Sequence, residues 1–253
     1  MVSTLRGLNI NAGYGSMNIV HDVSFEVSEG EVVAVVGPNG SGKSTLIKSV
    51  FGLCDVHSGQ LVLDNQNLRA TSGYKISGLG LSYVPQTANV FTNLSIKENL
   101  ELGLPAGRGN EIGNRIKELS KLFPILNERN VQLAGSLSGG ERQMVAIARA
   151  LMAKPKIIML DEPTAMLSPK YVGEIFKIIA EMRGQGIGIL LVEQNARKAL
   201  ELSDRAYVMI QGHVEFTGSG HEILSNENVE NMYLGRSKAN REKNQNKETV
   251  QAG

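Results

Sequence analysis

Short apolar runs separated by glycine-rich or polar turns dominate the first third of the chain and return in its second half. Residues 5–10 and 20–27 alternate apolar and polar positions, which is typical of half-buried strands. Residues 32–36, 157–160 and 187–192 are apolar throughout, which predicts strands buried on both faces of a parallel sheet. We therefore predict an α/β fold whose parallel core lies beside an antiparallel edge layer.

From Ser95 the pattern changes to a helical period. Ser95 and Glu98 have the spacing of a capping box, and residues 115–126 have an amphipathic helical pattern. Further along, Ser168 is predicted to cap a helix that continues over residues 170–182, with Pro169 at its first position. After Gly235 the chain is polar with almost nothing to bury, which predicts disorder. The expected organisation is one domain over residues 1–235, with its core at 1–94 and 154–235, a helical subdomain at about 95–153, and a disordered tail at 236–253.

Composition narrows the class of protein. The 253 residues carry a formal net charge of +1 with mixed signs, which leaves no basic field for binding nucleic acid. The single cysteine, Cys54, excludes an internal disulfide, fits a reducing compartment and is predicted to be a buried small hydrophobe. We find neither a signal peptide nor about 18 consecutive apolar residues, so we expect a cytoplasmic chain that reaches a membrane only through a partner.

Residues 37–45, Gly-Pro-Asn-Gly-Ser-Gly-Lys-Ser-Thr, lie between a predicted buried strand and a helix-like segment at 46–51. Strand, glycine-rich loop and helix form the context in which this pattern binds phosphate, because converging backbone N–H groups meet the positive end of a helix dipole. Lys43 can reach the β- and γ-phosphates, Ser44 can hold Mg²⁺, and Thr45 lies near the α-phosphate. The predicted nucleotide-binding residues are Gly37, Pro38, Asn39, Gly40, Ser41, Gly42, Lys43, Ser44 and Thr45.

Two carboxylates, Asp161 and Glu162, follow a buried strand at the edge where α/β sheets bind ligands. We expect Asp161 to hold Mg²⁺ through water and Glu162 to orient and deprotonate the attacking water. Alone, the pair would more simply be an acidic cap on a strand end; a phosphate loop in the same chain favours the catalytic interpretation. Gln86 follows another strand, and its amide can contact both Mg²⁺ and the water, although a surface glutamine is the commoner interpretation.

A second glycine-rich corner, Leu-Ser-Gly-Gly-Glu at residues 137–141, begins a predicted helix and repeats the anion-binding pattern. It lies about a hundred residues after the first loop, so one ATP need not contact both loops of one subunit. The separation suggests a dimer in which each chain completes the nucleotide site of the other.

These motifs, in this order, resemble the nucleotide-binding subunits of ABC transporters over roughly residues 3–235. Residues 37–45 match the Walker A motif, and Gln86 matches the Q-loop. Residues 137–141 match the signature motif, and residues 157–162 match Walker B. The resemblance implies an ATP sandwich with Lys43, Ser44 and Asp161 from one chain and Ser138, Gly139 and Gly140 from the other. Tyr14 lies in a predicted turn at residues 13–15. The resemblance implies that it stacks on adenine, and the alternative is a tyrosine that only forms part of the turn.

A finer resemblance is to the shorter ATPase subunit of branched-chain amino-acid importers. Its carriers are residues 13–15, 89–91, 162–164, 191–196 and 233–235. Two positions depart from the wider ABC pattern: Gln194 stands where a switch histidine is expected, and Ser168 where an aspartate is. A neutral amide at Gln194 can still donate one hydrogen bond to the γ-phosphate, but it lacks the charge of an imidazolium.

The resemblance implies an ATPase that uses ATP and Mg²⁺ to drive the import of branched-chain amino acids, on the inner face of the cell membrane. Expected partners are membrane-spanning permease subunits, contacted by the helical insert and residues 89–94, a sister ATPase or second copy, and indirectly an external solute-binding protein. Alternatives are an importer ATPase for urea, other amides or other solutes, and a subunit that hydrolyses ATP poorly. A non-transport ABC ATPase acting on DNA or ribosomes is disfavoured, because long coiled-coil insertions and a second cassette are absent.

Overall fold

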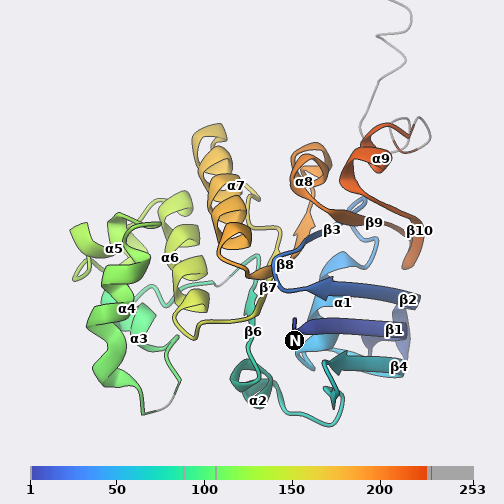
Figure 1. Cartoon of the computed structure of the whole chain (residues 1–253), viewed down its shortest axis with the longest axis horizontal. Helices are drawn as coiled ribbons and strands as arrows, with labels where there is room; N and C mark the ends of the chain where they lie inside the picture. The colour runs from blue at the N-terminus through green and yellow to red at the C-terminus, as the bar shows by residue number, and fades with distance from the viewer. Residues whose placement is uncertain (1, 88, 106, 227–228, 230–253) are drawn as a thin grey trace, which may run out of the picture.

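The computed structural model describes residues 2–87, 89–105, 107–226 and 229, so the predicted disordered tail lies outside the described residues. Two sheets form the centre of the molecule. One group of α-helices lies at one end of the molecule, and another group lies along one side of the sheets (Figure 1). The predicted α/β architecture, a parallel core beside an antiparallel layer, is confirmed.

The larger sheet has six strands in the order β10-β9-β3-β8-β7-β6, all parallel except β10, which runs antiparallel to β9. Side chains of β3 alternate between two cores, because Val33 and Val35 point to one and Val32, Ala34 and Val36 to the other. This explains the uninterrupted apolar run. The strands are β3 (Val32–Val36), β6 (Leu81–Val84), β7 (Ile157–Asp161), β8 (Gly188–Glu193), β9 (Arg205–Ile210) and β10 (His213–Gly218).

The smaller sheet is antiparallel, in the order β2-β1-β4-β5. The first strand is longer than predicted, because it continues through Tyr14, which we had placed in the turn; the turn is at residues 15–16. Register shifts along β1 absorb the irregular pattern between Gly7 and Gly13. The strands are β1 (Thr4–Tyr14), β2 (Met17–Ser28), β4 (Asp55–Leu63) and β5 (Gln66–Asn67).

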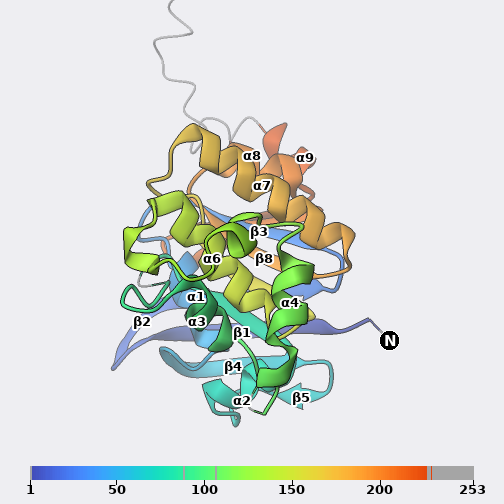
Figure 2. The same ribbon diagram turned by 90° about the vertical axis from the view of Figure 1, so that its left-hand side faces the viewer.

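One helix, α1 (Lys43–Val50), packs between the sheets, in the core that contains Val33 and Val35. The others gather around the remaining surfaces, and Figures 1 and 2 show α3 to α6 together at one end. They are α2 (Gly73–Gly78), α3 (Ile96–Glu101), α4 (Ile112–Leu119), α5 (Ile125–Glu128), α6 (Gly139–Leu151), α7 (Pro169–Gly184), α8 (Ala196–Leu202) and α9 (Gly220–Leu224), with 3₁₀ turns at Gly109–Glu111 and Ala134–Ser136.

The helix ends agree with the sequence in part. Ser95 and Glu98 form the predicted capping box at the start of α3. Ser168 is the N-cap residue of α7 with Pro169 directly after it, but its side chain makes no capping hydrogen bond, contrary to our prediction. The short helix α2 was not predicted, because glycines at both of its ends weaken the helical signal. Cys54 is only half-buried, so the prediction of a buried thiol is right in part.

Candidate functional site

A cavity of about 580 Å³ opens at the edge where the parallel strands β3, β6, β7 and β8 end. Each strand is followed directly by a loop, and all four loops contribute to the cavity wall, as expected for ligand sites of α/β sheets. Side chains far apart in sequence therefore meet here. The lining residues are Ile19, Asn39, Gly40, Gly42, Lys43, Ser44, Thr45, Gln86, Glu162, Ala165, Met166 and Gln194.

The loop after β3 depends on glycine at two places. A Cβ atom on Gly37 would lie 2.1 Å from the carbonyl oxygen of Met209, so the close approach of the two backbones requires glycine there. Gly42 immediately precedes α1 with φ 97°, a left-handed conformation that other residues rarely adopt. These constraints set the loop's course from β3 into the first turn of α1.

Lys43 is almost fully buried, with 4% of its surface exposed. Its Nζ donates to the carbonyl oxygens of Gly37 and Pro38, at 2.9 Å each. Burial lowers the pKa of Lys43, while the negative charges of Glu162 and Asp161 oppose that shift. The ammonium is thus held beside the cavity by two neutral carbonyls that an anionic ligand can replace.

The loop fits a phosphate group on three observations. The first N–H groups of α1 have no partner within the helix and point toward its N-terminal end. The buried hydroxyl of Ser41 has no hydrogen-bond partner among the described residues. The Lys43 ammonium supplies a full positive charge at the same place. Together they match the predicted phosphate-binding role.

Asp161, 2% exposed at the end of β7, is held by two hydroxyl groups. Ser44 Oγ donates to Asp161 Oδ1 at 2.7 Å, and the Tyr83 hydroxyl donates to Oδ2 at 3.2 Å. Burial, followed by the charge of Asp161, raises the pKa of Tyr83, so its hydroxyl keeps its proton. Sequence reasoning missed Tyr83; its signal was a tyrosine inside a short apolar strand that ends just before Pro85 and Gln86.

The oxygen atoms of Ser44 and Asp161 fit a hard cation such as Mg²⁺. Over the described parts of the chain, no group of three or more His, Cys, Asp or Glu side chains is arranged to hold a metal ion. A Mg²⁺ ion at this site would therefore take further ligands from phosphate oxygens and water, as nucleotide-bound Mg²⁺ commonly does.

Glu162 and Gln86 meet across the cavity although 76 residues separate them in sequence. Gln86 Nε2 donates to Glu162 Oε2 at 2.9 Å. Glu162 has φ 46°, an uncommon conformation for a residue other than glycine. Gln194 also lines the cavity. Glu162 and Gln86, predicted to act on the attacking water, and Gln194, predicted to bind the γ-phosphate, therefore share one cavity with the phosphate loop.

Glu193 is a buried carboxylate, 1% exposed, directly before Gln194. Its Oε1 accepts from Thr164 N at 3.1 Å and Thr164 Oγ1 at 2.7 Å, and its Oε2 accepts from the backbone N–H groups of Gln194 and Asn195 at 3.1 and 3.2 Å. Burial raises its pKa, and these bonds oppose the shift. It joins the loops after β7 and β8. We had not predicted this role; the signal was a charge directly after the apolar run at 187–192.

Two parts of the predicted site lie outside this cavity in the single chain. Ser138, Gly139 and Gly140 begin α6, where Ser138 and Glu141 form a capping box, and none of the three lines the cavity. Tyr14 is 46% exposed at the end of β1 and is also absent from the lining. The structure thus gathers the phosphate loop, Gln86, Glu162 and Gln194, and leaves the second glycine-rich corner elsewhere.

A glycine-rich loop after a buried parallel strand, followed by a helix and faced by two acidic residues at the end of another parallel strand of the same sheet, defines a P-loop nucleotide hydrolase. A family model described as ABC transporter matches residues 20–165. The chain therefore belongs to the ABC transporter family, as a subunit that binds and hydrolyses ATP.

Named relatives match nearly the whole chain. The probable branched-chain amino acid transport ATP-binding protein LivF of Archaeoglobus fulgidus is 46% identical over 91% of this chain and 98% of its own length. The high-affinity branched-chain amino acid transport ATP-binding protein BraG of Pseudomonas aeruginosa is 40% identical over 89% and 97%. The lipopolysaccharide export system ATP-binding protein LptB of Escherichia coli (strain K12) is 38% identical over 92% and 98%.

Solved structures agree. MJ1267, an ATP-binding cassette of an ABC transporter, superposes with a TM-score of 0.82 and 28% identity, over 93% of this chain and 100% of that one. A dimeric structure of the bacterial ABC transporter cassette MJ0796 superposes with a TM-score of 0.74 and 26% identity, over 85% and 98%. The resemblance to branched-chain amino-acid transport ATPases inferred from sequence motifs is thus confirmed.

Proposed function

We propose that this chain drives a branched-chain amino-acid importer, by binding ATP between two cassettes and releasing them after hydrolysis. The observation that carries the proposal is the meeting of Lys43, Gln86, Glu162 and Gln194 around one cavity. The names of the two most similar relatives reported above support the choice of cargo. Urea, other amides, or a lipid cargo like that named for LptB are the alternatives that an experiment must separate.

In this proposal Lys43 leaves the carbonyls of Gly37 and Pro38 to bind the β- and γ-phosphates. Ser44, Asp161 and Gln86 face the Mg²⁺ ion, which neutralises phosphate charge when bound. Glu162 takes a proton from the attacking water, and its hydrogen bond with Gln86 sets the direction of the carboxylate. Gln194 donates its amide hydrogen to the γ-phosphate.

The position of Ser138 supports a two-chain site. Ser138 and Gly139 are exposed and Gly140 is buried in a helix start that lies outside the cavity of its own chain, so a second cassette is needed to bring such a corner to the nucleotide. Met166 lines the cavity and is fully exposed, which fits a surface that a partner cassette covers. We propose that Ser138 and Gly140 of one chain contact the γ-phosphate bound by the other, while Tyr14 stacks on adenine.

Residues 89–94 and the helical subdomain at about 95–153 are the proposed contact with the permease. Asn99 orders this segment, since its Oδ1 accepts from Phe91 N at 2.8 Å and its Nδ2 donates to Phe91 O at 3.0 Å. Phe91 is 52% exposed and stacks against Arg149, which lines a groove of about 480 Å³ that also includes Tyr83. Because Tyr83 also contacts Asp161, the groove adjoins the nucleotide site.

No helix within the described residues is long and apolar enough to cross a membrane. We propose that the permease holds this subunit at the inner face of the cell membrane, together with a sister ATPase or a second copy of this chain.

The proposed role of Glu162 is tested by Glu162→Gln in the complex purified with its co-expressed permease subunits. ATP binding should be unchanged, because the phosphate loop is untouched, while hydrolysis falls by roughly 10²- to 10⁴-fold, the usual contribution of a general base. Glu215→Gln, on the exposed side of β10, is the matched control and should leave both unchanged. Unchanged turnover in Glu162→Gln would show that Glu162 is not the base.

The cargo is tested with the same complex in vesicles, supplied with a purified solute-binding protein that binds branched-chain amino acids and, in a parallel sample, with one that binds urea. Leucine, isoleucine or valine should stimulate ATP hydrolysis and accumulate inside, whereas urea should not. Stimulation by urea alone would move the assignment to the amide importers, and stimulation by lipopolysaccharide alone would refute an importer.

A further inference from the structure

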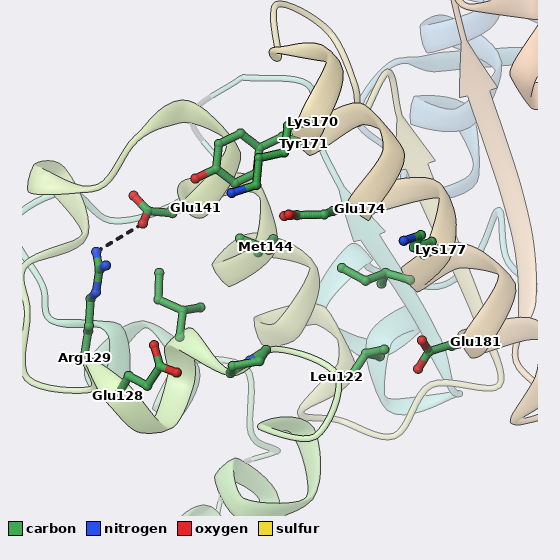
Figure 3. Close-up of a pocket in the computed structure, with 13 residues that line it drawn as sticks. Leu122, Glu128, Arg129, Glu141, Met144, Lys170, Tyr171, Glu174, Lys177 and Glu181 are labelled. Atoms are coloured by element: carbon green, nitrogen blue, oxygen red, sulfur yellow. Dashed lines mark hydrogen bonds and ion pairs between the residues drawn. The ribbon is translucent and has the colours of Figure 1, made fainter.

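Tyr171, in the first turn of α7, covers the helix start that contains Ser138 and Gly140. A Cβ atom on Gly140 would lie 2.1 Å from Cγ of Tyr171 and 2.4–2.5 Å from two other ring atoms, so the ring lies directly on this glycine. Ser138 Oγ donates to the Tyr171 hydroxyl at 3.3 Å. Figure 3 shows the ring turned from α7 toward α6, where Glu141 lies, at one end of the groove between the two helices.

The hydrogen-bonding capacity of Ser138 shows what this contact can do. A serine hydroxyl has one proton to donate and two lone pairs to accept with. One lone pair accepts from the backbone N–H of Glu141 at 3.3 Å, in the capping box of α6. If Ser138 gives its only proton to Tyr171, none remains for a phosphate. If Tyr171 donates instead, both lone pairs are used and the serine proton is free to point outward.

We propose that Tyr171 is a positioning residue for ATP-driven dimer closure: once the γ-phosphate bound by the partner cassette is in reach, the Tyr171 hydroxyl donates to Ser138 Oγ and leaves the Ser138 proton for that phosphate. The inference rests on the proposed contact of Ser138 with that phosphate. When the phosphate arrives, the hydroxyl pair reverses direction, with Tyr171 becoming the donor, and no heavy atom needs to move. The ring itself holds the glycine backbone of the same corner in place through the contact with Gly140.

Tyr171→Phe tests the hydroxyl alone, because phenylalanine keeps the ring on Gly140. In the Glu162→Gln background, the ATP concentration that gives half-maximal dimer formation is measured by analytical ultracentrifugation, on the full chain with any subunits that co-purify. It should rise about 3- to 10-fold, the effect of one hydrogen bond. Binding of a fluorescent ATP analogue to the dilute single chain should not change, because Tyr171 does not line the cavity that holds Lys43.

Tyr207→Phe is the matched control. It also removes one tyrosine hydroxyl, which accepts from Glu26 N at 3.1 Å away from both glycine-rich corners, and it should leave the half-maximal ATP concentration unchanged. Ser138→Ala tests whether Tyr171 acts through the serine. The double variant Ser138→Ala/Tyr171→Phe should match Ser138→Ala alone, since the tyrosine hydroxyl then has nothing to position.

Four results would overturn the inference, the last of them together with the proposed function. The first is that Tyr171→Phe forms the dimer at the same ATP concentration as the parent chain although Ser138→Ala weakens dimer closure. In that case the proposed two-chain site would stand, but Tyr171 would have no part in it. The second is that the effects of Ser138→Ala and Tyr171→Phe on the half-maximal ATP concentration add fully in the double variant. The third is that the single Tyr171→Phe chain binds nucleotide more weakly than the wild type. Either result would indicate a tyrosine with only a structural role. If Ser138→Ala itself has no effect, the two-chain phosphate contact fails together with the inference.

Discussion

Replacing Glu193 with glutamine changes one oxygen atom into an amide nitrogen at a buried junction of two loops. All four groups that face the Glu193 carboxylate are donors in the structure: Thr164 N and Oγ1 on one side, and the backbone N–H groups of Gln194 and Asn195 on the other. Glutamine has the same shape but only one acceptor oxygen. Its NH₂ group must therefore face donors on one side.

The cheaper orientation places the NH₂ group toward Thr164, because the threonine hydroxyl can rotate and accept from it. The Thr164 N–H then loses its partner while the residue remains 7% exposed. An unsatisfied buried donor costs about 1–3 kcal/mol. The neutral amide recovers part of this, since it avoids burying the charge whose desolvation raises the pKa of Glu193. The net fall in the free energy of unfolding should therefore be smaller than that cost, about 1–2 kcal/mol.

Urea unfolding followed by circular dichroism measures the loss, with Glu29→Gln as the control. Glu29 also accepts from a backbone N–H, that of Ser3 at 3.1 Å, but near the surface, so its replacement should cost much less. ATP turnover of the assembled complex should fall in Glu193→Gln as well, because the loop that carries Gln194 loses an anchor. A Glu193→Gln chain as stable as the wild type would refute the reasoning, since charge burial would then outweigh the hydrogen bonds.

Three further outcomes are expected. Tyr83→Phe keeps the ring stacked on Phe51 but removes one hydroxyl group from Asp161. In urea unfolding the chain should lose about 1–2 kcal/mol of stability, and its ATPase should need more Mg²⁺ for half-maximal activity. An unchanged Mg²⁺ dependence would show that the hydrogen bond from Ser44 is enough to hold Asp161. Gln194→His should speed single-turnover hydrolysis by less than about tenfold, because the amide already supplies one donor; a larger gain would mark a poorly hydrolysing subunit. Burial, aided by Asp55, raises the pKa of Cys54 to about 11, so alkylation of the native chain by iodoacetamide should rise about tenfold per pH unit between pH 7 and 10. At pH 8 the urea-unfolded chain should react far faster, and equal rates by mass spectrometry would contradict the raised pKa.

Local patterns along the chain were sufficient for the strands and the phosphate loop. The apolar runs, the glycine spacing of the loop and the capping residues act on near neighbours, so their physical consequences can be predicted without knowing the fold. The same holds for Gln86, Glu162 and Gln194, which lie within two residues of a strand end, because parallel strands place such residues at one edge of the sheet. Three local predictions were wrong or missing. Strand β1 is longer than predicted, Ser168 makes no side-chain cap, and the short helix α2 was not predicted.

Only the tertiary structure decided which side chains support those residues. Tyr83 reaches Asp161 across 78 positions of sequence, and Tyr171 reaches Ser138 across 33, through strand pairing and helix packing that periodicity does not encode. Glu193 was visible as a charge after an apolar run, but its four donors come from two separate loops. A hydrogen bond requires two groups within about 3 Å, and that proximity is set by the packing of the whole chain rather than by the residues beside either partner.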